Sequence, residues 1–144
     1  MTKSFLVVGF ATLLAASVSA QSARYNPEAE TSVSGVIRYV ISAAAPDGTV
    51  GVHLELRTTN DGVVRVHLAP AMFIGMNNFS FYTDDTVAIR GARVTRDGTT
   101  DIWARLIVKD GKTLVLRDED GTPRWPRASV EDPDGCGVAH GPIR

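Results

Sequence analysis

Short β-strand patterns recur along the chain at regular intervals, and turn dipeptides separate them. The stretches alternate apolar and polar residues or are rich in β-branched ones, which is typical of strands in small barrels and sandwiches. They cover residues 32–41, 52–58, 63–69, 86–94, 101–109 and 112–118. Asp-Gly occupies the turns at 47–48, 61–62, 97–98, 110–111 and 120–121. Because glycine adopts positive φ without steric cost, these dipeptides favour tight reversals, and the series predicts an all-β domain.

One segment departs from the strand pattern. PAMFIGMNNFSFY (70–82) begins with proline, a favourable first helical residue, and places Met72, Phe73 and Met76 near helical spacing. It predicts a short helix over about 70–77, between the third and fourth strands. The predicted order is β-β-β-α-β-β with an additional C-terminal strand. Closing such a sheet into a barrel removes exposed strand edges, so a small closed barrel is the expected architecture.

Several motifs resemble those of the OB-fold. DDTVAIRGARV (84–94) resembles the G-D-x-V-x-V-x-G signature of strand four in OB domains, with Asp84 where glycine is usual, and Gly35 lies where a bent first strand turns a barrel corner. VHLAP (66–70) and LRDEDGTPRW (116–125) are similar to segments of small exported bacterial OB-fold proteins of unassigned function. The resemblance covers residues 32–125 and implies a closed OB-like barrel. Its motifs concern the fold and imply no catalytic activity.

The flanking segments differ in composition from this domain. Residues 1–20 combine one basic residue, an apolar run and small residues at 18–20, which predicts a signal peptide and a secreted or periplasmic location. A retained N-terminal anchor is the alternative, and no later stretch is apolar enough to cross a membrane. Residues 21–31 are expected to form a linker. Residues 126–144, rich in Pro, Gly and Asp, are expected to form a disordered tail.

The charge of the chain disfavours nucleic-acid binding, and its cysteine content excludes an internal disulfide. Removal of residues 1–20 takes away Lys3 and no acid, so the net charge moves from −1 to −2. Nucleic-acid binders usually carry a basic excess, which this chain lacks. Cys136 is the single cysteine, so no internal disulfide can form.

The hairpin VHLELRTTNDGVVRVHLAP (52–70) contains two of the three histidines. A three-residue loop over 60–62, with Gly62 in the left-handed region, pairs Leu56 with Val66 and Leu54 with Leu68. That register places Arg57 opposite Arg65, Glu55 opposite His67 and His53 opposite Ala69. Alternation then directs one polar row outward, onto the usual ligand face of OB-folds. The row is the predicted ligand-binding site and consists of His53, Glu55, Arg57, Arg65 and His67.

Four interpretations of this polar row stay open. The row can be a plain solvated face, because alternating strands direct polar residues toward water. The adjacent arginines favour an anionic or nucleic-acid ligand, but aromatic stacking platforms are missing. His53, Glu55 and His67 form a weak candidate metal site. A protein contact is the fourth interpretation.

The sequence predicts no catalytic residues. No Gly-x-Ser-x-Gly turn or phosphate-binding glycine loop occurs, and the carboxylate pairs lie in turns. We therefore expect a non-enzymatic binding module without a cofactor, whose partner is an envelope protein or an anionic ligand. A single-strand nucleic-acid-binding OB domain and an envelope scaffold are the alternatives.

Overall fold

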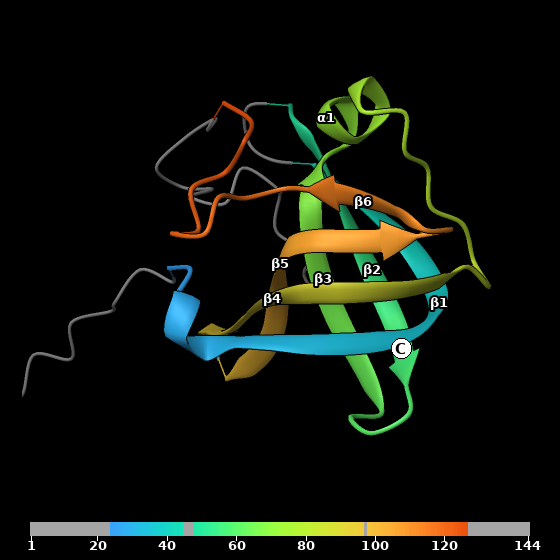
Figure 1. The fold of residues 1–144 in the computed structure, drawn as a ribbon, viewed down its shortest axis with the longest axis vertical. Helices are drawn as coiled ribbons and strands as arrows, with labels where there is room; N and C mark the ends of the chain where they lie inside the picture. Colours follow the sequence, from blue (N-terminus) through green and yellow to red (C-terminus); the bar gives the residue numbers. More distant parts are fainter. Residues whose placement is uncertain (1–23, 45–47, 97, 127–144) are drawn as a thin grey trace, which may run out of the picture.

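The computed structural model describes residues 24–44, 48–96 and 98–126, and all six predicted strands occur in it (Figure 1). A 3-10 helix precedes the strands, and a short helix lies between the third and fourth. The elements are η1 (Pro27–Ala29), β1 (Glu30–Ala44), β2 (Val50–Thr58), β3 (Val63–Pro70), α1 (Ala71–Met76), β4 (Thr86–Arg96), β5 (Thr99–Lys109) and β6 (Lys112–Val115).

Five of the strands close into a barrel. The sheet order is β3-β2-β1-β4-β5-β6, and an additional parallel pairing joins β3 to β5. That pairing sets Val66 beside Ile102 and His67 beside Trp103. The sixth strand is added antiparallel to β5. The predicted all-β class, a closed OB-like barrel with one helix and an additional C-terminal strand, is confirmed.

The first strand serves two neighbours by bending at its middle. Gly35 is paired with Thr58 of β2 and with Val87 of β4. A Cβ atom added to Gly35 would lie 2.6 Å from the Arg57 carbonyl oxygen. The predicted corner position of Gly35 thus corresponds to a close backbone approach that only glycine permits. In Figure 1, β1 runs from η1 across the barrel and curves strongly toward its far end.

The turn into β4 accounts for the departure from the OB signature. Asp84 stands where glycine is usual, and its φ is +73°. This left-handed conformation is favourable for glycine and tolerated by aspartate. The Asp84 backbone N–H donates to the Ile37 carbonyl oxygen at 2.8 Å, which ties the turn to β1.

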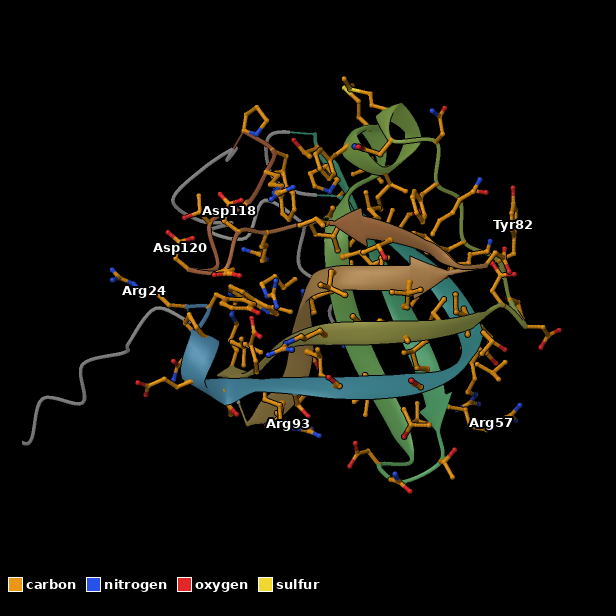
Figure 2. The ribbon with its side chains drawn as sticks, viewed as in Figure 1. Arg24, Arg57, Tyr82, Arg93, Asp118 and Asp120 are labelled. Atoms are coloured by element: carbon orange, nitrogen blue, oxygen red, sulfur yellow. The ribbon has the colours of Figure 1, made fainter. Side chains whose placement is uncertain are left out.

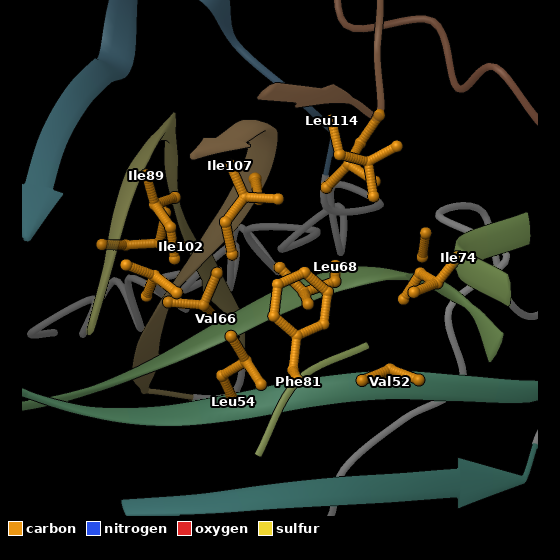
Figure 3. Close-up of a cluster of buried hydrophobic side chains, with 14 of the residues drawn as sticks. Val52, Leu54, Val66, Leu68, Ile74, Phe81, Ile89, Ile102, Ile107 and Leu114 are labelled. Carbon is orange, nitrogen blue, oxygen red and sulfur yellow. The ribbon is translucent and has the colours of Figure 1, made fainter. Parts of the chain in front are cut away.

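The core lies inside the barrel and is filled by alternating apolar side chains (Figure 3). Leu54 and Leu56 of β2 and Val66 and Leu68 of β3 are fully buried. Ile74 of α1 and Phe81 also belong to the core. The inward face predicted for the hairpin is therefore confirmed.

The segments that flank the predicted domain lie partly within the described residues. The segment 21–31, predicted as a linker, includes η1 and the first residues of β1, which begins at Glu30. The predicted signal peptide (1–20) and nearly all of the predicted tail (126–144) lie outside the described residues. Within the described part of the chain, no helix has the length and apolar character to span a membrane.

Candidate functional site

The β2–β3 hairpin has a different register from the predicted one. The last pair before the turn is Arg57 with Val63, and the Thr58 backbone N–H donates to the Gly62 carbonyl oxygen at 2.8 Å. The Thr58 hydroxyl donates to the same carbonyl at 2.9 Å and accepts from the Asp61 N–H at 3.0 Å. These hydroxyl bonds stabilise a longer turn than the predicted three-residue loop. Gly62 is left-handed as expected, with φ +66°.

The shift changes every predicted polar pair but keeps the polar row on one face. His53 lies opposite His67, and Glu55 lies opposite Arg65. The predicted pairs Glu55–His67, Arg57–Arg65 and His53–Ala69 are therefore wrong. The two imidazole ring centroids are 4.2 Å apart, with the rings tilted by 57°. Arg57 and Arg65 therefore do not lie directly opposite each other, which weakens the anionic-ligand interpretation.

Most of the polar row is also buried, contrary to the predicted outward surface. His53 and Glu55 are at most 1% exposed, Arg65 is 4% exposed and His67 is 6% exposed. Only Arg57 is exposed, and Figure 2 shows it pointing away from the barrel at the end of β2. Alternation separates the two faces of a sheet, but it does not reveal whether other parts of the chain cover the second face.

Barrel closure adds an acidic partner that sequence reasoning missed. Asp101 of β5 approaches β3, and its Oδ2 lies 2.7 Å from His67 Nε2. An ionised carboxylate only accepts hydrogen bonds, so in a bond with an ionised Asp101 the donor is His67 Nε2–H. Asp101 and His67 are 34 residues apart in the chain. The β3–β5 pairing of the closed barrel brings them together.

A second polar centre lies where β1, β4 and β5 meet. Glu30 accepts hydrogen bonds from the Tyr25 hydroxyl at 2.7 Å, from Arg105 Nε at 2.6 Å and from Arg90 Nε at 2.8 Å. Burial raises the pKa of Glu30, but the hydrogen bonds from Arg105, Tyr25 and Arg90 outweigh it and lower the pKa to about 2. Burial and the hydrogen bond to Glu30 raise the pKa of Tyr25.

An aromatic box around Arg117 adjoins this centre. The guanidinium carbon lies 5.0 Å from the ring centroid of Trp125, 5.3 Å from that of Trp103 and 5.7 Å from that of Tyr25. Arg117 is buried, and its Nη1 donates to the Gly121 carbonyl oxygen at 3.0 Å. The guanidinium is thus held by cation–π contacts as well as by a hydrogen bond. The ring centroids of Trp103 and His67 are 6.2 Å apart, so the aromatic box lies beside the histidine pair.

Metal ligation was one interpretation of the polar row. Among the residues that the structure describes, no group of three or more His, Cys, Asp or Glu side chains is placed to hold a metal ion. His53, Glu55 and His67, the weak metal candidates from sequence, do not form such a group in that part of the chain.

The exposed surface carries apolar side chains that the sequence-based site did not include. Met72 and Met76 of α1 are each 77% exposed, and Tyr82 is 64% exposed. Tyr39 and Val40 of β1 and Val50 of β2 are exposed to lesser extents. Figure 2 shows Tyr82 projecting from the segment that leads into β4. These side chains, unlike the histidine pair, are exposed to solvent.

Comparison with known proteins gives one assignment. The model of the MamS/MamX magnetosome protein family matches residues 29–114, which is more than half of the chain and includes all of β1 to β5. A search of curated proteins found no match.

Proposed function

Because the chain belongs to the MamS/MamX magnetosome protein family, we propose that it is a non-enzymatic binding module that contacts another protein of the magnetosome. We further propose that it works outside the cytoplasm, as the pattern of residues 1–20 predicts. The observation that carries the proposed contact is the exposed methionine pair of α1. The OB-like barrel serves in this proposal as the rigid support for that pair.

The methionine pair is presented by a firmly anchored helix. Met72 and Met76 are four residues apart, so they share one helical face, and both are largely exposed. On the other side of α1, Ile74 is buried in the core, and the Phe73 ring lies 5.6 Å from that of Trp125. Flexible thioether side chains on a fixed helix suit an adaptable apolar contact.

The charge around the methionine pair favours a protein partner. Residues 71–78, AMFIGMNN, include no charged side chain. Helices that bind a lipid surface usually combine their apolar face with Lys or Arg, and nucleic-acid contacts need cations for the phosphates. An uncharged apolar surface on a protein partner matches this composition best.

The polar row of the hairpin has a structural role in this proposal. His53, Glu55, Arg65 and His67 are buried, which favours a structural role over direct contact with a ligand. The bond between His67 and Asp101 joins β3 to β5 at the seam where the barrel closes. We therefore assign these four buried residues to closure of the barrel, and we propose the exposed helix as the contact surface.

The test is association of the chain with magnetosomes isolated from cells that form them. The double variant Met72→Ser plus Met76→Ser should lower the bound fraction by roughly tenfold or more, since central apolar contacts dominate protein interfaces. Its melting temperature should match the wild type, because both side chains are exposed. Tyr82→Ser, another exposed apolar position, is the control and should bind normally.

Two outcomes would contradict the proposal in different ways. If the double variant binds as the wild type does, the helix is not the contact surface. If the wild-type chain itself is absent from the magnetosome fraction, the proposed association with the magnetosome is wrong.

A further inference from the structure

In the part of the chain that the structure describes, the outer half of β1 has a backbone edge that no second strand pairs with. Residues 30–36 pair with β4 and residues 35–44 pair with β2, so from residue 37 onward β1 pairs with β2 alone among the described strands. At the bend, Ile37 N–H donates to the Asp85 carbonyl oxygen, and the Ile37 carbonyl oxygen accepts from Asp84 N–H. The Thr83 hydroxyl reaches the Arg38 carbonyl oxygen at 3.4 Å. Beyond that point, no hydrogen bond from another described residue is found along the edge of residues 39–44 that faces away from β2.

This edge lacks the usual protection against strand pairing. Residues 39–44 read YVISAA, which combines aromatic and β-branched residues without charge or proline. Tyr39 is 44% exposed and Val40 is 38% exposed. The terminal strand of the sheet, β6, is by contrast four residues long and begins with the exposed Lys112. Natural proteins protect edges by shortness, lysine or proline, so of these two edges the β1 edge is better suited to pairing.

We propose that this edge pairs antiparallel with the same edge of a second copy of the chain, so that two barrels share one continuous sheet. We choose a second copy as the partner because the edge is complementary to itself. Residues 39–44 contain no charge, so self-pairing opposes no like charges. A two-fold axis through Ile41 sets Tyr39 opposite Ala43 and Val40 opposite Ser42, so each large side chain faces a small one.

Self-association of the full chain, as processed by the cell, tests the proposal. Sedimentation equilibrium from roughly 1 µM to 1 mM should show a monomer–dimer equilibrium for the wild type. Val40→Lys should weaken dimerisation by roughly tenfold or more, because the two-fold axis places the lysine in the interface twice. Val40→Thr preserves strand preference without charge and should dimerise as the wild type does. Tyr39→Lys tests the other face of the same strand.

The outcomes separate this edge from other surfaces. A wild-type chain that stays monomeric over this range overturns the proposal. A dimer of unchanged affinity in both lysine variants overturns it as well, because another surface then forms the interface. If Val40→Lys lowers the melting temperature, the dimerisation affinity of Tyr39→Lys decides whether this edge forms the interface. The methionine double variant should dimerise normally, so this inference fails or holds independently of the proposed function.

Discussion

Glu30 illustrates how one buried carboxylate can organise the residues around it. Its two oxygens accept from Tyr25, Arg90 and Arg105, which come from three different parts of the chain. Arg105 and Glu30 are both largely buried in this arrangement. A buried carboxylate with these partners is stabilising only while it is ionised.

The first prediction concerns the pH dependence of stability through Glu30. Its pKa falls from the ordinary 4.5 to about 2 in the folded chain. As the pH falls, Glu30 is therefore protonated in the unfolded chain before it is protonated in the folded chain. The stabilisation from ionised Glu30 is complete above pH 4.5 and disappears toward pH 2. Glu30→Gln should lower the free energy of unfolding at pH 7 by roughly 3 kcal/mol.

Urea unfolding of the wild type and Glu30→Gln at several pH values checks this prediction. The stability difference between the two proteins should be largest at neutral pH and should shrink as the solution is acidified. Glu28→Gln, at an exposed neighbouring position, should behave as the wild type does at every pH. A difference that stays constant from neutral to acidic pH would show that the Glu30 carboxylate is not the titrating group.

At the scale of elements, the bend of β1 depends on the absence of a side chain at Gly35. Gly35→Ala would place a Cβ 2.6 Å from the Arg57 carbonyl oxygen, so β1 and β2 must separate. We expect a loss of about 2 kcal/mol in the free energy of unfolding, typical of overpacking at a tight contact. Equilibrium urea unfolding measures it.

Gly75→Ala is the matched control for this substitution. A Cβ at Gly75 of α1 would meet nothing within 4 Å. Alanine is also the better helix former by about 1 kcal/mol, so this variant should be as stable as the wild type or more stable. Equal losses for the two variants would contradict the steric explanation at Gly35.

At the scale of the whole molecule, the two ends of the described chain interlock. Tyr25, before η1, contacts the Arg117 guanidinium and also lies against Gly121, which follows β6. Figure 2 shows Arg24 on the same side of the barrel as Asp118 and Asp120. The N-terminal segment therefore completes the aromatic box around Arg117.

The third prediction follows from this interlock. A Cβ at Gly121 would clash with the Tyr25 ring, so Gly121→Ala should be more destabilising than Gly48→Ala. Both glycines have similar positive φ values, +90° and +85°, and Gly48 has nothing within 4 Å. The backbone cost is thus matched, and the difference should be about 1–2 kcal/mol.

A double-mutant cycle separates the Tyr25 contact from other causes. In a Tyr25→Ala background, Gly121→Ala should cost no more than Gly48→Ala in thermal or urea unfolding. An undiminished excess cost at Gly121 without the Tyr25 ring would argue against the interlock.

Local sequence patterns were sufficient for the fold and insufficient for the candidate site. Alternation and Asp-Gly turns located every strand, and the segment 70–82 identified the helix. The hairpin register failed because the Thr58 hydroxyl stabilises a longer turn, a choice between loops that hydrophobic alternation does not resolve. Both registers bury the same apolar face, since they differ by two residues.

The sequence alone determined which side chains fill the barrel, because strand alternation is a local property of the backbone. Only the tertiary structure decided that the other face of the hairpin is buried, that Asp101 bonds His67, and that Tyr25 reaches Arg117. Those contacts join residues far apart in the chain, and they arise from barrel closure. The tertiary structure also decided that the helix methionines and the outer edge of β1 are exposed, because it buries most of the other apolar side chains in the core.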